Sequence, residues 1–254
     1  MLPELDIGPI TLQTFGICFA LAFLAAGWVV SKRLRELGHP PDWSYEIIFS
    51  GLLGGLVGAR VDYLIQNWDD VSDDLFGSIF SGTGLVWLGG MIGGAIGVCL
   101  WAWRRGYLRR ELLDVCSVPL ALGYAIGRVG CQLSGDGDYG EPSDLPWAMG
   151  YPDGTVPTPP GVEVHPTPVY EMLAMGGVAL LLWRLRNRYD PGVLFAIYLV
   201  LAGVERLLVE IIRRNDSVIA GLTLPQLISL VMIAFGAGLI ARWGGLRTRR
   251  TQQN

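Results

Sequence analysis

Charged residues are scarce in this chain, and hydrophobic residues are abundant. Asp, Glu, Lys and Arg make up 17% of its 254 residues, whereas 51% are hydrophobic and the mean hydropathy is +0.42. A soluble globular domain has about a quarter of its residues charged. The composition therefore excludes an ordinary soluble domain and indicates an integral membrane protein.

Several common sequence signals are also absent. The four cysteines lie in apolar segments, with neither the pair spacing of a metal site nor a disulfide framework, so we interpret them as reduced packing residues. The first residues, MLPELDIGPI, lack a basic region and a small-residue cleavage site, which predicts no removable signal peptide. We expect no metal, no cofactor and no nucleic-acid partner, and a single membrane domain over residues 1–254.

Long apolar segments recur along the chain. Read in windows of about 20 residues, the length of a membrane-crossing helix, they predict an all-α polytopic protein with seven transmembrane helices. These are expected at roughly 10–30, 45–66, 83–103, 112–133, 166–185, 191–212 and 222–243. Thirty-five glycines suit helices whose backbones pack closely in lipid. The Gly-, Pro- and Asp-rich segment 134–165 is expected to be an outer loop.

Basic residues concentrate in alternate connections between these segments. Fourteen of the 19 fall on one side: Lys32, Arg33, Arg35, Arg104, Arg105, Arg109, Arg110, Arg184, Arg186, Arg188, Arg242, Arg247, Arg249 and Arg250. The other side holds the N-terminus, the acidic segment 69–74 and the loop 134–165, which contain no Lys or Arg. The positive-inside rule then places the N-terminus outside and the C-terminus in the cytoplasm.

A few charged residues lie within the apolar segments. They are Arg60, Arg128, Arg206, Glu46, Asp62, Glu171, Glu205 and Glu210. A charge inside a bilayer costs at least about 3 kcal/mol unless an opposite charge compensates it. Arg128 and Arg206 are therefore the strongest indication of function in the sequence.

The second of these arginines begins a regular series. Arg206, Glu210 and Arg213 are spaced i, i+4 and i+7, so on a helix they share one face and can pair in sequence. This stripe keeps a net charge of +1, and Arg128 approaches the same end from another helix. Because arginine binds phosphate through paired hydrogen bonds, the surplus of positive charge predicts a phosphate site.

These arginines also have a purely structural interpretation. Arg128 and Arg206 could satisfy Glu171, Glu210 or Asp136 as internal salt bridges that hold the helices together. Such pairing requires no surplus of positive charge, so the surplus distinguishes the two interpretations.

Two polar segments border the predicted outer loop. The segment 123–140 leads from an apolar span into glycines and the carboxylates of Asp136 and Asp138, a pattern typical of a helix end followed by turns. The segment 165–171, HPTPVYE, opens the next span with two prolines, which suit a helix start. It places a His, a Tyr and a Glu at the water boundary.

Together these motifs resemble the prolipoprotein diacylglyceryl transferase family. The motifs are GAR, a Gly-Gly-x-Ile-Gly span, GRxG with a Gly-acid-Gly turn, HPTPxYE, RxxxExxR and a last span opened by LPQLIS. The resemblance covers nearly the whole chain. It implies a bacterial inner-membrane enzyme that transfers the diacylglyceryl group of phosphatidylglycerol to the thiol of a lipobox cysteine and releases glycerol phosphate. The implied partners are this lipid, a prolipoprotein lipobox peptide and the bilayer.

The resemblance also assigns roles to residues. Arg128 matches the family's headgroup arginine, and Asp136 or Asp138 falls where the family has a glutamate. The residues expected in catalysis are Arg128, Arg206, Glu210, His165, Asp136 and Asp138. Those expected to bind substrate are Arg128, Arg60, Arg213, Tyr170, Glu171 and Gly140. Departures from the family pattern are Leu88 for a histidine proposed as catalytic, Cys131 for an asparagine, and Phe15 and Ala202 for tyrosines.

The base that would deprotonate the acceptor thiol stays open at this stage. The candidates are His165, Asp136 or Asp138, and Glu210, or the arginines alone could lower the thiol pKa. Two other function classes also stay open. One is an anionic-phospholipid-binding or lipid-moving membrane protein without chemistry, and the other is a carrier built on similar charges.

Overall fold

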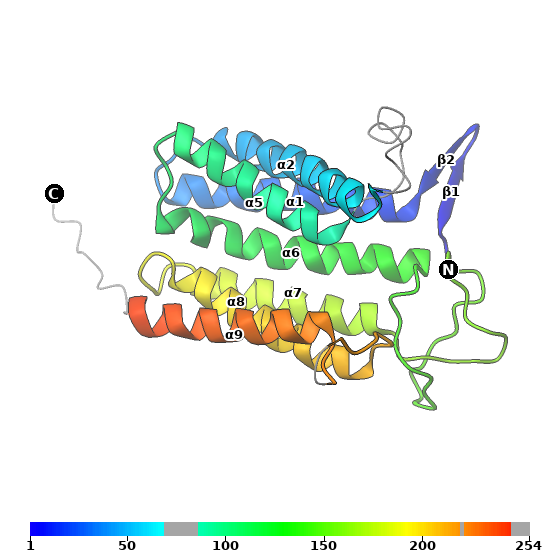
Figure 1. The fold of residues 1–254 in the computed structure, drawn as a ribbon. Helices are drawn as coiled ribbons and strands as arrows, with labels where there is room; N and C mark the ends of the chain where they lie inside the picture. Colours follow the sequence, from blue (N-terminus) through cyan, green and yellow to red (C-terminus); the bar gives the residue numbers. More distant parts are fainter. Residues whose placement is uncertain (69–85, 219–220, 245–254) are drawn as a thin grey trace. The chain divides into compact units, whose positions relative to one another are not determined.

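The computed structural model describes residues 1–68, 86–218 and 221–244. This part of the chain is mostly helical, as the sequence predicted (Figure 1). The elements are β1 (Glu4–Ile7), β2 (Ile10–Gln13), α1 (Thr14–Glu36), α2 (Trp43–Gln66), α5 (Trp87–Arg104), α6 (Arg110–Ser134), α7 (Thr167–Leu185), α8 (Val193–Val209), the 3-10 turn η2 (Glu210–Ile212) and α9 (Leu224–Trp243).

The chain begins with a β-hairpin, which corrects the predicted start of the first helix. The strands β1 and β2 pair in antiparallel register, with Ile7 opposite Ile10. Gly8 between them has a φ of 64°, the left-handed conformation that a two-residue hairpin turn needs at its first position. The helix expected over 10–30 therefore begins at Thr14, because residues 10–13 belong to this hairpin.

Among the residues that the structure describes, five helices, α1, α2, α6, α7 and α9, are long and apolar enough to cross a membrane, which supports a multi-pass membrane protein. The helix α5 is diluted by glycines and tryptophans, and α8 has 17 residues. Seven crossings and their sidedness therefore stay predictions. The acidic segment 69–74 and the basic residues Arg247, Arg249 and Arg250 lie outside the described residues.

The chain divides into two compact units, one of residues 30–112 and one of residues 1–29 with 113–254. In the first, α2 and α5 pack through glycines. A Cβ built on Gly58 would overlap the carbonyl oxygen of Gly89 and lie 2.8 Å from the Cα of Gly93. The two backbones thus approach as closely as the glycine-rich sequence predicted.

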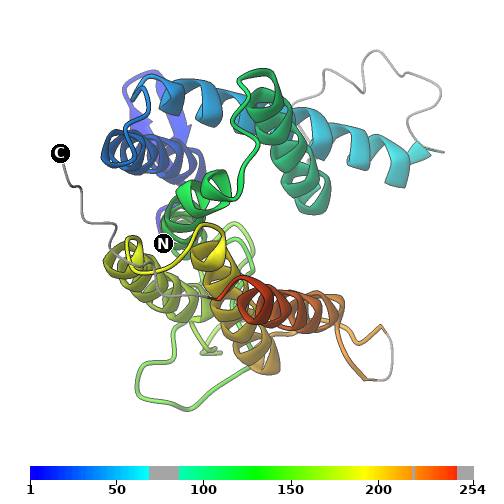
Figure 2. The same ribbon diagram turned by 90° about the vertical axis from the view of Figure 1, so that its left-hand side faces the viewer.

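In the other unit, α7, α8 and α9 lie side by side (Figures 1 and 2). Its core is formed by small and aliphatic side chains from several helices: Val29, Val118, Ala121, Ala125, Met175, Ala179, Leu182, Leu194 and Ala202. Gly203 and Gly236 bring α8 and α9 into close contact, because a Cβ at either position would meet atoms of the other helix at 2.9 Å or less. This packing fixes the helix ends that carry the polar site.

The connection between α6 and α7 is itself folded. Met149 and Val164 exchange two backbone hydrogen bonds of 3.0 Å, and the ring of buried Tyr151 stacks on Tyr139 with centroids 4.8 Å apart. The amide of Gly140 donates to the carbonyl of His165 at 2.9 Å. These contacts hold the start of the connection against the beginning of α7.

Candidate active site

One buried carboxylate joins three helices. Glu171 on α7 is 0% exposed, and its Oε1 accepts hydrogen bonds from Arg206 Nη1 on α8 at 2.9 Å and from Tyr124 Oη on α6 at 3.0 Å. Its Oε2 lies 2.8 Å from Arg128 Nε, also on α6. A buried carboxylate is costly unless it is paired, so the two arginines make the position of Glu171 possible.

A second carboxylate approaches the arginines from the connection after α6. Asp138 pairs through Oδ2 with Arg128 Nη1 and through Oδ1 with Arg213 Nη2, the latter at 2.5 Å. Burial raises the pKa of Asp138, but Arg128 and Arg213 outweigh this effect and hold the pKa below its usual value. Thr167 Oγ1 donates to the backbone carbonyl of Asp138, which fixes the turn against α7.

The end of α8 departs from the predicted stripe. Arg206 Nη2 lies 2.8 Å from Glu210 Oε2, as the i, i+4 spacing predicted. The chain then tightens into η2, and Arg213 has extended backbone angles, with φ −86° and ψ 156°. Arg213 therefore leaves the helical face and pairs with Asp138 rather than Glu210.

Two polar side chains complete the environment of Glu210. Its Oε1 accepts hydrogen bonds of 2.7 Å from Thr223 Oγ1 and from Asn215 Nδ2. The same Thr223 oxygen accepts the amide of Gln226 at 3.3 Å and so caps α9. Glu210 is thereby held by α8 and by the start of α9.

The charges in this network balance, which corrects an expectation from the sequence. Three arginines, Arg128, Arg206 and Arg213, face three carboxylates, those of Asp138, Glu171 and Glu210. The surplus of positive charge disappears because Glu171 on α7 and Asp138 from the connection after α6 both pair with these arginines. The contacts of the salt-bridge interpretation do form, although Arg128 pairs with Asp138 and not Asp136.

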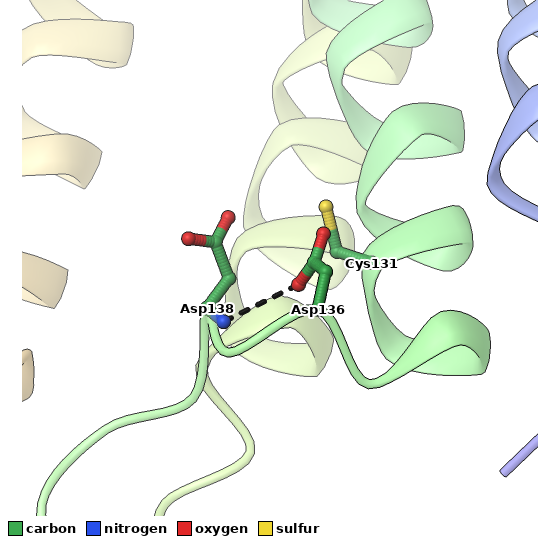
Figure 3. Close-up of side chains that lie close together, drawn as sticks. All are labelled: Cys131, Asp136 and Asp138. Carbon is green, nitrogen blue, oxygen red and sulfur yellow. Dashed lines mark hydrogen bonds between the residues drawn. The ribbon is translucent and has the colours of Figure 1, made fainter. Parts of the chain in front are cut away.

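Asp136 and Cys131 lie beside this network. Figure 3 shows both near Asp138, whose backbone amide donates to Asp136 Oδ1 at 3.2 Å. One ligand atom from each of the three residues lies within 4.8 Å of the others, a spacing that a metal ion can use. Both oxygens of Asp138 already face guanidinium groups, so the donor set fits a cation poorly.

The remaining predicted residues of this unit, His165, Tyr170 and Gly140, make contacts other than ion pairs with the arginines. His165 Nδ1 lies 3.4 Å from the hydroxyl of Tyr170, which accepts the indole N–H of Trp147 at 2.8 Å. Within the described parts of the chain, no ion pair joins His165 or Tyr170 to the arginines. Gly140 forms an isolated antiparallel bridge with Arg213, so its backbone borders the network.

Arg60 belongs to the other compact unit. It is buried on α2, and its guanidinium lies 5.2 Å from the centre of the Tyr63 ring. Its expected role in substrate binding stays a prediction.

Two residues of the site received no role from the sequence. Tyr124 bridges the network, because its hydroxyl also accepts Arg128 Nη2 at 3.1 Å and its ring lies 4.9 Å from that guanidinium carbon. Glu205 is 8% exposed, and its Oε1 has no hydrogen-bond partner among the residues described. Its position directly before Arg206 in an apolar span was the available signal.

A polar hollow of about 320 Å³ borders the network. Its lining residues are Gly137, Tyr139, Arg213, Arg214 and Asn215. Arg213 and Gly137, which precedes Asp138, thus face this hollow, and a polar group in it can reach this end of the ion-pair network.

Comparison with known sequences identifies the family. The sequence model of the family described as prolipoprotein diacylglyceryl transferase matches residues 4–242 of this chain. The chain belongs to this family. Proteins named phosphatidylglycerol–prolipoprotein diacylglyceryl transferase are similar along almost their whole length. The one from Clostridium tetani is 31% identical over 224 residues, covering 87% of this chain and 89% of the relative. The one from Azotobacter vinelandii is 30% identical over 273 residues, covering 98% and 97%. The family and enzyme class expected from the motifs are confirmed.

Proposed function

We propose that this transferase moves the diacylglyceryl group of phosphatidylglycerol to the thiol of a lipobox cysteine in a prolipoprotein. The observation that carries the proposal is the match to the transferase family over residues 4–242, and the three guanidinium groups around Glu171 and Asp138 are the candidate phosphate donors. Arginines suit the phosphate of a lipid headgroup because each can donate two parallel hydrogen bonds to it.

The chemistry requires charge stabilisation at the leaving group. The thiolate sulfur attacks the glyceryl carbon that bears the phosphate ester, so a C–S bond forms and the C–O bond breaks. The electron pair of that bond leaves with glycerol phosphate. Arg128 is held in place by the buried carboxylate of Glu171 before this charge develops, which is the condition for electrostatic catalysis.

The thiol proton needs an acceptor, since a free thiol is only a few per cent ionised near pH 7. Glu210 is fully engaged by Arg206, Thr223 and Asn215. His165, Asp136 and Asp138 stay candidates for this step, as does a thiolate stabilised by the arginines alone. Gly140, Tyr170 and Arg60 stay proposed contacts for the lipid or the peptide.

The proposal extends to the arrangement in the membrane. We place seven helices across a bacterial inner membrane, with the N-terminus and the connection 134–165 outside and the C-terminus in the cytoplasm. The basic residues of alternate connections support this orientation. The whole chain then acts as a single membrane domain.

A direct assay tests the function. The protein, purified in detergent, is incubated with phosphatidylglycerol and a synthetic lipobox peptide, and mass spectrometry follows the thioether product and glycerol phosphate. We expect both products in equal amounts. Bound phospholipid without either product would refute the transferase assignment and favour a lipid-binding protein.

A further inference from the structure

Asp138 occupies two arginines in the way a phosphate would. Its two carboxylate oxygens are divided between Arg128 on α6 and Arg213 beyond η2. A phosphodiester presents two non-bridging oxygens that bind a pair of guanidinium groups with the same division. The carboxylate therefore takes up the donors that a bound phosphate needs.

Because the charges of the network balance, the pairing of Asp138 with both arginines opposes the binding of a phosphate. Three arginines already pair with three carboxylates, so a phosphodiester that binds Arg128 and Arg213 gives this largely buried network one more negative than positive charge. Such a charge is strongly unfavourable away from water. Binding becomes favourable when one carboxylate leaves the arginines as the phosphate arrives.

Of the three carboxylates, Asp138 is the one placed to leave. The side chains of Glu171 and Glu210 are both 0% exposed, and each is held by contacts from more than one helix. The side chain of Asp138 is 32% exposed and lies in the connection after α6. It follows Gly137, which lines the polar hollow, so its carboxylate can turn toward water.

We propose that Asp138 is a built-in competitor for the substrate phosphate, which must displace its carboxylate from Arg128 and Arg213 before the lipid binds productively. The inference rests on the proposed function for the identity of the lipid. Its direct consequence is that the apparent affinity for phosphatidylglycerol is lower than the affinity of the two arginines alone. The apparent affinity equals the affinity of the two free arginines multiplied by the fraction of molecules in which Asp138 has released both.

A binding experiment tests the competition without chemistry. The dissociation constant for phosphatidylglycerol is measured in detergent, without acceptor peptide, for the wild type and Asp138→Asn. We expect it to fall at least about fivefold in the variant, because the neutral amide no longer competes for both guanidinium groups. Asp138→Glu keeps the charge and should bind like the wild type. Asp153→Asn removes an exposed charge of the same connection and serves as the matched control.

Equal or weaker binding by folded Asp138→Asn would overturn the inference, as would an equal gain in Asp153→Asn. Should Asp138→Asn not fold, hydrogen exchange on the wild type gives the answer. Phosphatidylglycerol should speed exchange at the amide of Asp138, which now donates to Asp136, whereas diacylglycerol without phosphate should not. Unchanged exchange would also overturn it. Tighter binding by Asp138→Asn, together with no transfer by the wild type, would contradict the proposed function alone.

Discussion

Glu171 and Arg206, on neighbouring helices, are joined by a 2.9 Å hydrogen bond, and the same carboxylate lies 2.8 Å from Arg128. One fully buried acid thus fixes the two in-span arginines that first indicated function. Removing it leaves two guanidinium groups without their shared partner.

The variant Glu171→Gln should therefore be strongly destabilised. Breaking a buried ion pair by neutralising one member costs about 3–5 kcal/mol. Thermal unfolding in detergent measures the loss. Glu163→Gln, at an exposed position of the outer connection, should change the stability by less than about 0.5 kcal/mol. Equal midpoints for the two variants would show that Glu171 is not the organising acid.

Arg128→Ala should abolish most of the transfer reaction. Loss of one preorganised donor to developing charge typically lowers the rate about 100- to 1000-fold. Initial rates of thioether formation measure the effect at saturating lipid. Arg188→Ala, at an exposed position on the basic side of the chain, should keep the wild-type rate. Retained activity in Arg128→Ala would show that the phosphate is bound elsewhere.

Asp138 should stabilise the fold in a pH-dependent way. Because its pKa in the folded protein lies below the unfolded value of about 3.9, its contribution is present above that value. The contribution is lost as pH falls through the lower, folded pKa. Asp138→Asn should thus be less stable than the wild type at pH 7, and the difference should shrink below about pH 4. A difference that stays constant down to pH 3 would contradict this assignment.

The glycines between α2 and α5 should resist enlargement. Gly93→Ala places a methyl group against the backbone of Gly58, and overpacking of this kind costs about 1–3 kcal/mol. Gly176→Ala on α7 has open space around the new Cβ, so it should be neutral or slightly stabilising. Unfolding midpoints of the two variants give the comparison. A stable Gly93→Ala protein would show that the helices can separate without cost.

Neutralising Glu205 should not destabilise the protein, in contrast to neutralising Glu171. It is buried without a hydrogen-bond partner for Oε1 among the described residues, so Glu205→Gln removes an unsatisfied acid rather than a paired one. We expect an unfolding midpoint equal to or above that of the wild type. A loss as large as that of Glu171→Gln would reveal a partner for Glu205 in the folded protein.

The sequence predicted the helices well because long apolar windows report burial in lipid directly. Five of the seven predicted spans correspond to helices long and apolar enough to cross a membrane. Local spacing also predicted the pair Arg206–Glu210. It could not predict that Arg213 turns away, since this depends on the switch from α8 to η2. The choice of Asp138 over Asp136 likewise depends on a loop conformation, which has no periodic pattern.

The hydroxyl of Thr223 has a consequence for the mobility of α9. It donates its proton to Glu210 and accepts the amide of Gln226, so both of its hydrogen-bonding roles are fixed. A slip of α9 by one turn, about 5.4 Å along its axis, would carry the capping Thr223 away from Glu210 and break the bond between them. The axial register of the last helix is therefore tied to the position of a single acid on the neighbouring helix.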